Sequence, residues 1–487
     1  MLLYLESFGN PHKFARLARR VARRKPVLSL KAGSTEAGAR AASSHTAALA
    51  SSDAAVDALF RQAGVIRAET LEELVDAAAL LSTQPLPRGR RVGVLTNAGG
   101  LGILCADACA AAGLELPEPS KETRAALAPL LPADASLSNP VDLLGSATGE
   151  TYDAVIPPLL ADKRFDALIV LFVPPVVAGA DEVAAAIQRA VVRAETDKPV
   201  LAVLISNEGT PPALRDGEST AASFAYPESA ARALGLAAAR AEWLRRPAGA
   251  VPPAVEVNAG EARRLVEEAL AESGDAWLDS RGARALLMAY GVPVVGERTA
   301  ETPDDAVEAA RALGFPVVLK SAEAGAHKTE QGGVALDLRD ESQVREAAER
   351  IGAVLVQPMV RGGAELLAGV VQDPVFGPLV AFGPGGVLAE LIGDASFRIA
   401  PLTDVDAEEL VSEGKVGRLV AGFRGAPAAD VGALVDLLHR LSRLAEDLPE
   451  VAELDLNPVI ALPTGCVAVD ARVRLCRIQS EPRLKTW

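Results

Sequence analysis

Short apolar runs alternate with Ala- and Arg-rich helical segments along the first half of the chain, and this alternation constrains the fold more than any other feature. "MLLYLE" (1–6) and "PVLSLKAG" (26–33) are typical of strands, and the segment 11–25 between them is typical of a helix. Thr70 and Glu73 have the spacing of a capping box that starts a further helix. Strands joined by helices form parallel sheets that are buried on both faces. The sequence therefore predicts an α/β fold built on parallel sheets.

Two proline-rich stretches, "STQPLPRGR" and "RRPAGAVPPAVEVNAG", divide the chain. Both are typical of linkers, because proline and glycine interrupt helices and strands. After the first linker, "RVGVLTNAGGLGILCADACAAAGLEL" has the order strand, glycine turn and helix; after the second, the sequence is rich in strands and ends on a hairpin-like pair. We therefore predict three domains, at 1–85, 89–250 and 258–487.

Composition excludes several classes of protein. The net charge of −15 disfavours a broad surface for nucleic acid or anionic membranes. No apolar run is long enough to span a bilayer, and the start "MLLYLESFGN" lacks the basic region of a signal peptide. The four cysteines contain no CxxC pair, so neither a zinc site nor a disulfide framework is indicated. A cytoplasmic protein without nucleic-acid or membrane partners is expected.

His45 stands in a run of small residues, "ARAASSHTAALASS", just before a predicted helix. The N–H groups and the dipole of a helix N-terminus stabilise an anion, so a phosphorylated imidazole would be stabilised there. Glu6 ends the first predicted strand, at the sheet edge where ligands bind, and is placed to accept a hydrogen bond from the ring of His45. Taken alone, His45 is more typical of a polar loop or a helix cap, and Glu6 is more typical of an exposed loop carboxylate.

Two loops of the second predicted domain are candidates for phosphate binding. "TNAGGLGI" (96–103) is a glycine-rich turn between a strand and a helix, and the backbone around Asn97, Gly99 and Gly100 can cradle a phosphate. Asn139 lies in a second Gly/Ser/Asn loop, "SLSNPVDLLGSATGE". Such turns are common, and each one alone is also an ordinary connection.

Lysines surround a glycine pair in the last third of the chain. "VVLKSAEAGAHKTEQGGVAL" places Lys320 at the end of a strand, and His327 and Lys328 in the loop that follows. Two lysines near a flexible glycine loop suit a triphosphate.

Further along, Gln357 and Met359 in "LVQPMV" fit an adenine-binding hinge, and Glu365 fits a ribose ligand. Asn457 and Asp470 fall on what are predicted to be adjacent strands. Their oxygen atoms suit a magnesium ion that bridges phosphates, although Asn457 alone is more typical of an Asn-Pro turn.

Together these segments resemble a known family, the NDP-forming acyl-CoA synthetases (ADP-forming acetate–CoA ligases), which are relatives of succinyl-CoA synthetase. "SSHTAALASSDAAVDALFRQAGVIRAETLEELVDAA" is similar to the phosphohistidine segment, and "VLTNAGGLGIL" and "NPVDLLGSAT" to the second ligase domain. "LKSAEAGAHKTEQGGV", "LVQPMVRGGAELLAGVVQDPVFGPLVAFGPGGV" and "ELDLNPVI" resemble the ATP-grasp domain. The resemblance implies two flavodoxin-like parallel-sheet domains, the first truncated, followed by an ATP-grasp domain.

The resemblance also implies a reaction: acyl-CoA, ADP and phosphate are interconverted with carboxylic acid, CoA and ATP through phosphorylated His45. Glu6 would steady the imidazole, His327 would relay the phosphoryl group, and Asn457 and Asp470 would bind Mg²⁺. The implied ATP-binding residues are Lys320, Lys328, Gln357, Met359, Glu365 and Arg398.

One departure from the family concerns the start of the chain. Family members usually carry a CoA-binding domain before the phosphohistidine domain, whereas this sequence starts at "MLLYLE". We therefore expect an exposed sheet edge in the first domain, a CoA-binding domain supplied by another chain or by a missing N-terminus, and an oligomer. The alternative is a non-catalytic or regulatory ATP-binding module, a fragment of a longer ligase or acyltransferase protein.

Overall fold

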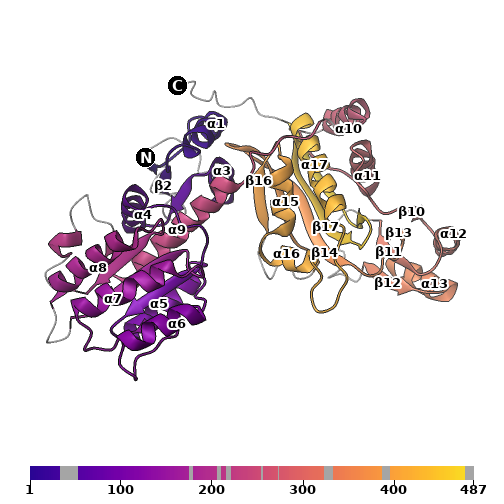
Figure 1. Cartoon of the computed structure of the whole chain (residues 1–487). Coiled ribbons are helices and arrows are strands. Elements are labelled where there is room, and N and C mark those ends of the chain that lie inside the picture. Colours follow the sequence, from indigo (N-terminus) through magenta and orange to yellow (C-terminus); the bar gives the residue numbers. More distant parts are fainter. Residues whose placement is uncertain are drawn as a thin grey trace. The chain divides into compact units, whose positions relative to one another are not determined.

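The computed structural model describes residues 1–32, 53–174, 179–205, 210–214, 221–253, 256–272, 274–322, 333–386 and 395–477. The chain divides into two compact units, each taken by itself below (Figure 1). The first contains Met1–Phe8, Lys13–Ala48 and Phe60–Pro247, and the second contains Gly9–His12, Leu49–Leu59 and Ala248–Trp487. No helix within the described ranges has the length and apolar character needed to cross a membrane.

The first unit begins with a three-stranded parallel sheet in the order β1-β2-β3. Its strands are β1 (Leu2–Leu5), β2 (Leu28–Lys31) and β3 (Ile66–Ala68), and the helices along this part of the chain are α1 (Pro11–Ala22), α3 (Asp53–Ala63) and α4 (Leu71–Thr83). The predicted cap of α4 is confirmed, because the Thr70 hydroxyl accepts the amide of Glu73 at 3.1 Å. The carboxylate of Glu73 accepts the amide of Glu69 rather than that of Thr70. β1 is the edge strand of this sheet, and Leu2 and Tyr4 are exposed on it.

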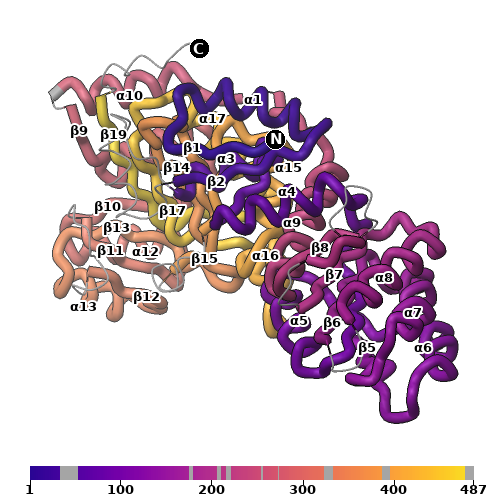
Figure 2. Tube along the Cα trace, turned by 90° about the vertical axis from the view of Figure 1, so that its left-hand side faces the viewer, coloured from indigo at the N-terminus to yellow at the C-terminus, as the bar shows by residue number. Residues whose placement is uncertain are grey.

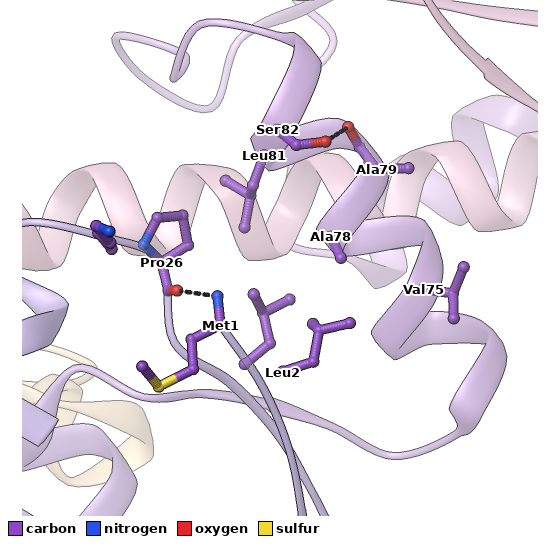
Figure 3. Close-up of a pocket in the computed structure, with 10 residues that line it drawn as sticks. Met1, Leu2, Pro26, Val75, Ala78, Ala79, Leu81 and Ser82 are labelled. Atoms are coloured by element: carbon purple, nitrogen blue, oxygen red, sulfur yellow. Dashed lines mark hydrogen bonds between the residues drawn. The ribbon is translucent and has the colours of Figure 1, made fainter. Parts of the chain in front are cut away.

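An apolar cavity of about 510 Å³ lies between this edge and α4 (Figure 3). The Met1 amino group donates to the carbonyl of Pro26 at 2.9 Å on one side, and Val75 and Leu81 of α4 line the other. None of the residues predicted for a functional site lines this cavity.

The first unit continues with a five-stranded parallel sheet in the order β5-β4-β6-β7-β8. Its strands are β4 (Val92–Thr96), β5 (Val141–Asp142), β6 (Ala167–Phe172), β7 (Val200–Leu204) and β8 (Ala222–Phe224). The connecting helices are α5 (Gly99–Ala111), α6 (Lys121–Leu127), η1 (Ala128–Leu130), α7 (Gly149–Ala161), α8 (Ala180–Ala194), η2 (Pro212–Leu214) and α9 (Pro227–Arg245). Every residue of β4, β6 and β7 is buried, because helices cover both faces of the sheet. This is the doubly wound order 2-1-3-4-5, which places ligands at the carboxyl ends of β4 and β6, where the strand order reverses.

The second unit contains two antiparallel sheets. The four-stranded sheet has the order β10-β13-β11-β12. It consists of β10 (Arg298–Ala300), β11 (Val317–Ser321), β12 (Val334–Leu338) and β13 (Val354–Pro358), with α12 (Pro303–Leu313) and α13 (Glu341–Ile351) packed on it. Apolar residues of both helices and of β11 and β13 form its core.

The larger sheet has seven strands in the order β16-β15-β14-β17-β19-β9, with β18 paired to β17. Figure 2 labels its strands β9, β19, β17, β14 and β15. Its strands are β9 (Asp275–Trp277), β14 (Ala364–Asp373), β15 (Gly377–Pro384), β16 (Ser396–Ile399), β17 (Val451–Ala461), β18 (Cys466–Ala468) and β19 (Arg472–Cys476). The helices of this part are α10 (Ala259–Glu272), α11 (Ser280–Ala289), α15 (Asp404–Ser412), α16 (Gly414–Val420) and α17 (Val431–Asp447). Leu434, Leu437, Leu438 and Leu441 of α17 are buried against the sheet at helical spacing. The predicted hairpin-like pair is confirmed as β17 and β18.

Candidate functional site

Three of the predicted site residues, His45, His327 and Lys328, lie outside the described residues. The remaining ones fall on two separate parts of the fold. One group surrounds the ends of parallel strands in the first unit, and the other, apart from Arg398, lies between the two sheets of the second unit.

Asn97 follows β4 and ties together the two strand ends at the switch point of the five-stranded sheet. Its side-chain amide donates to the carbonyl of Val173 at 2.8 Å, and its side-chain oxygen accepts the amide of Val173 at 2.9 Å. The side chain is therefore a brace between β4 and β6. Gly99 starts α5 immediately beyond it, and a Cβ added at Gly100 would meet nothing within 4 Å. The turn thus leaves open space beside Gly100, as a phosphate-binding loop requires, whereas a Cβ added at Gly99 would lie 3.0 Å from Oδ2 of Asp142.

Asn139 has a different position from the one that its sequence context suggests. Its side chain accepts the amide of Val94 at 2.9 Å and donates to the carbonyls of Val92 at 2.8 Å and Pro117 at 2.9 Å. These three bonds hold its loop against β4 and favour a structural role. Glu6 is exposed and follows β1 at the carboxyl end of a parallel strand, as expected. The predicted bond from Glu6 to His45 stays a prediction.

The second unit brings Lys320 and Asp470 together from its two sheets. Lys320 lies on β11 with only 13% of its side chain exposed, and its Nζ is 3.8 Å from Oδ1 of Asp470. The same Nζ donates to the carbonyl of Val469 at 2.6 Å. A phosphate would bind to such a half-buried ammonium, and a divalent cation would bind to the carboxylate beside it.

Asn457 lies beside Asp470 on the larger sheet. The pairing of β17 with β14 shifts register between Leu366 and Ala368, at the level of Asn457. The amide of Val469 donates to the carbonyl of Pro458 at 3.1 Å, which holds the segment of Asp470 against this part of β17. The side-chain oxygen of Asn457 accepts the amide of Gly386 at 2.8 Å. The two residues predicted to bind magnesium are thus neighbours.

Asp455 is a further acidic residue that the sequence reasoning missed. Burial raises the pKa of Asp455; Arg472 opposes this, and the negative charges of Asp470 and Glu453 add to it. Strand alternation in "ELDLNP" was the available signal, because Asp455 and Asn457 share a face of β17 while Leu454 and Leu456 point into the core.

The described residues contain no group of three or more His, Cys, Asp or Glu that could hold a metal ion. A smaller set of oxygen ligands is available, namely two carboxylates and one amide oxygen, from Asp455, Asp470 and Asn457. Magnesium takes hard oxygen ligands and retains several waters when it also binds phosphates, so this mixed set fits Mg²⁺ in the presence of a nucleotide.

Gln357 and Glu365, predicted for the adenine and ribose contacts, border the same region. Gln357 is buried, and its amide donates to Glu297 at 3.0 Å, while the backbone amide of Met359 donates to the carbonyl of Pro316 at 2.9 Å. Glu365 is exposed on β14, and a Cβ added at Gly386 would lie 2.1 Å from its Oε2. Gly386 is therefore next to the side chains of both Glu365 and Asn457.

Arg398 is not brought together with these residues. It is 1% exposed, and its guanidinium forms ion pairs with Glu413 at 2.9 Å and Glu409 at 3.4 Å. A buried guanidinium held by two carboxylates is a structural element of β16 and α15, so the geometry does not support the predicted contact with ATP.

Comparison with known proteins agrees with this arrangement. Three family models match consecutive parts of the chain: a succinyl-CoA ligase like flavodoxin domain at 1–81, a ligase-CoA domain at 92–252 and an ATP-grasp domain at 268–475. The acetate–CoA ligase [ADP-forming] I of Archaeoglobus fulgidus is 37% identical over 98% of this chain and 70% of its own length. The chain belongs to the NDP-forming acyl-CoA synthetase family.

Two other members of this family differ in substrate and in organisation. A 4-hydroxybutyrate–CoA ligase [ADP-forming] of Nitrosopumilus maritimus is 32% identical over 98% of this chain and 70% of its own length. The alpha subunit of acetate–CoA ligase [ADP-forming] II of Pyrococcus furiosus is 40% identical over 47% of this chain and 53% of that subunit. The predicted fold class is confirmed: two sheets of flavodoxin type precede an ATP-grasp domain.

Proposed function

We propose that the chain is an acyl-CoA synthetase that interconverts acyl-CoA, ADP and phosphate with a carboxylic acid, CoA and ATP. The observation that carries this proposal is the pair of Lys320 and Asp470, 3.8 Å apart and next to Asn457. The ammonium of a lysine and a set of possible oxygen ligands lie together in a domain of ATP-grasp type, which supports a nucleotide site. The relatives named above support the reaction.

Each group has a proposed role in the nucleotide half of the reaction. The ammonium of Lys320 binds phosphate oxygens, and Glu365 contacts the ribose. Asp455, Asn457 and Asp470 would hold Mg²⁺, which supplies positive charge that offsets the charge of the phosphates. Gln357 and Met359 border the adenine, with Gln357 kept in place by Glu297.

The transfer itself is proposed to use His45 as carrier. A ring nitrogen of His45 bonds to the terminal phosphorus of ATP while the bond from that phosphorus to the bridging oxygen breaks, and ADP leaves. Glu6 keeps the other ring nitrogen protonated and hydrogen-bonded, so that the attacking nitrogen holds its lone pair. The glycine turn at Gly99 and Gly100 receives the phosphorylated ring, and His327 is proposed as a relay.

For the acid substrate and for the part that binds CoA, we propose a class of molecule and a class of domain. The two full-length relatives act on acetate and 4-hydroxybutyrate, so we propose a small carboxylic acid. One relative is a subunit, and we propose that CoA is bound by a domain in the same or in a second polypeptide. We place the enzyme in the cytoplasm as an oligomer.

Phosphorylation of the full chain tests the carrier role. Incubation with Mg²⁺ and ATP labelled at the terminal phosphate should give a protein-bound phosphate that is labile in acid and stable in base. His45→Ala should abolish the label, and His12→Gln, which changes an exposed histidine of α1, should leave it unchanged. Label that persists in a protein carrying both His45→Ala and His327→Ala would contradict the assignment.

A second assay separates the enzyme from a regulatory module. ATP should form from ADP and phosphate when acetyl-CoA and a polypeptide with the family's CoA-binding domain are added. Tight nucleotide binding with neither a phosphohistidine nor ATP formation would instead favour a non-catalytic ATP-binding module.

A further inference from the structure

β1, the edge strand of the three-stranded sheet, has backbone groups that face away from the sheet. The carbonyls of Met1 and Leu5 accept backbone amides of the neighbouring β2 segment at 2.9 Å each. Because alternate residues of a strand bond to opposite sides, the backbone groups of Leu2 and Tyr4 point away from β2. No strand of the described residues pairs with that side of β1. A further strand can therefore extend the sheet there.

The five-stranded sheet of the same unit shows what such a position holds when it is filled. Its strands β6, β7 and β8 are parallel and adjacent in chain order, as β1, β2 and β3 are. β4 pairs with β6 in parallel, on the side that corresponds to the open side of β1, and every residue of β6 is buried. Along β1, exposed and half-buried residues alternate instead. By this comparison, the place beside β1 suits a parallel strand equivalent to β4.

The cavity beside α4 corresponds to the place of the helix that follows such a strand. In the five-stranded sheet, α5 follows β4 and packs against α9, and Cys105 and Cys109 of α5 share a core with Leu234 of α9. α4 is the counterpart of α9, because each follows the last strand of its sheet. No α5 counterpart packs on α4 among the described residues of the first sheet; the cavity of about 510 Å³ lies there instead.

The walls of the cavity have the character that a packed helix needs. Leu2 and Leu28 of the sheet lie on one side, and α4 lies on the other (Figure 3). The residues that α4 contributes include a stripe of apolar or small side chains at helical spacing: Val75, Ala78, Ala79 and Ser82. This stripe is distinct from the buried face of α4, which contains Leu74 and Ala77. α4 thus has a second face that a neighbouring helix could cover.

We propose that β1 and this cavity bind a strand–helix unit of the CoA-binding part of the enzyme. Its strand extends the sheet in parallel at β1, and its helix packs on the stripe of α4. The matched relatives are long enough to contain such a unit, because the chain covers 70% of the Archaeoglobus fulgidus ligase. Only the identity of this partner rests on the proposed function.

A second copy of this chain fits the same surface less well. Two copies related by a twofold axis would pair their β1 strands antiparallel. Such a pair would bring no helix to the stripe of α4, and the apolar cavity would stay uncovered. The comparison with β4 and α5 requires a parallel strand and a helix together.

Binding between two purified polypeptides tests the proposal. One is the full chain, and the other is the part of the Archaeoglobus fulgidus ligase outside its match to this chain. Calorimetry without nucleotide should show a one-to-one complex of micromolar affinity or tighter. Tyr4→Pro should weaken it by about 10-fold, because proline removes an outward-facing amide while edge strands tolerate it. Tyr4→Val keeps that amide and should bind within about threefold of the wild type.

A matched pair of substitutions tests the cavity. Val75→Glu places a charge on the stripe and should weaken the complex by about 10-fold or more. Val192→Glu, on α8 of the same unit, should leave the affinity unchanged. Val75 is 54% exposed and Val192 is 62% exposed, so neither substitution should lower the melting temperature of the isolated chain.

Three outcomes would overturn the proposal. They are no complex with the wild-type chain, unchanged affinity of both Tyr4→Pro and Val75→Glu, and dimerisation of the chain alone that Tyr4→Pro abolishes, which would assign the edge to a second copy. These measurements need no nucleotide, and the phosphorylation assay needs no partner. A labelled chain that forms no complex would therefore refute this proposal alone, whereas a complex that yields neither phosphohistidine nor ATP would refute the proposed function alone.

Discussion

Replacing Lys320 with methionine should weaken the binding of Mg²⁺–ADP by about 30-fold or more. The substitution keeps most of the stem and removes the charge from a side chain that is only 13% exposed. Two unit charges at the 3.8 Å that separates Lys320 from Asp470 attract by about 4 kcal/mol at an effective dielectric constant of 20. A phosphate at a similar distance would gain a similar amount. Because Asp470 is 39% exposed, solvent reduces the gain to about 2 kcal/mol, which is a factor of about 30 in affinity.

Calorimetry on the full chain measures this effect. Adenosine, which has no phosphate, should bind the Lys320→Met protein as well as it binds the wild type, and Lys163→Met, an exposed lysine of the first unit, should bind ADP normally. Combining Lys320→Met with Asp470→Asn should cost less than the two single losses added together, because both groups act on the same phosphates and metal. ADP affinity of Lys320→Met within threefold of the wild type would refute the placement of the phosphates at this lysine.

Two further substitutions test the fold that carries the site. Asp166→Asn should reduce stability at pH 7 by about 1–3 kcal/mol, because the Asp166 carboxylate binds the guanidinium of Arg91 at 2.8 and 2.9 Å. Burial raises the pKa of Asp166, but the hydrogen bonds from Arg91 lower it by more, so the pKa lies below its ordinary value. The difference in urea midpoints should therefore disappear as the pH falls below 4 and through the lowered pKa. Gly385→Ala should destabilise the protein by about 1–3 kcal/mol and weaken ADP binding, because its Cβ would lie 2.4 Å from backbone atoms of Leu366. Gly260→Ala, where a Cβ would meet nothing within 4 Å, should change neither property. Melting curves measure the stability, and calorimetry measures the ADP affinity.

The sheets could be predicted from the sequence because their signals are local. Apolar runs of strand length, separated by capped helices, determine a parallel sheet, and the strands β4, β6 and β7 are buried throughout as such runs require. The helix cap at Thr70 could be predicted for the same reason, since the Thr70 hydroxyl and the Glu73 amide that donates to it are three residues apart. The candidate roles of Lys320 and Asp470 were predicted from their sequence context and agreed with the family resemblance, whereas their proximity required the structure.

The roles of Asn139 and Arg398 could not be read from the sequence. Both residue types are common in phosphate and nucleotide sites, but a side chain's partners lie on distant segments. Asn139 bonds to the backbone 22 to 47 residues away, and Arg398 bonds to the carboxylates of Glu409 on α15 and of Glu413, which caps the start of α16.

Asp455 gives a last prediction, which links the metal to stability. Burial raises the pKa of Asp455, and the negative charges of Asp470 and Glu453 add to this against the effect of Arg472. A carboxyl whose folded pKa is raised contributes stability at low pH that is lost as the pH rises through that pKa. Without Mg²⁺, Asp455→Asn should therefore raise the melting temperature at pH 7.5, and this gain should shrink as the pH falls toward 4. With Mg²⁺–ADP the order should reverse, because the wild-type carboxylate gains a cation and the amide does not. A lower melting temperature of the ligand-free variant at pH 7.5, or an equal rise on adding Mg²⁺–ADP, would show that Asp455 does not belong to the metal site.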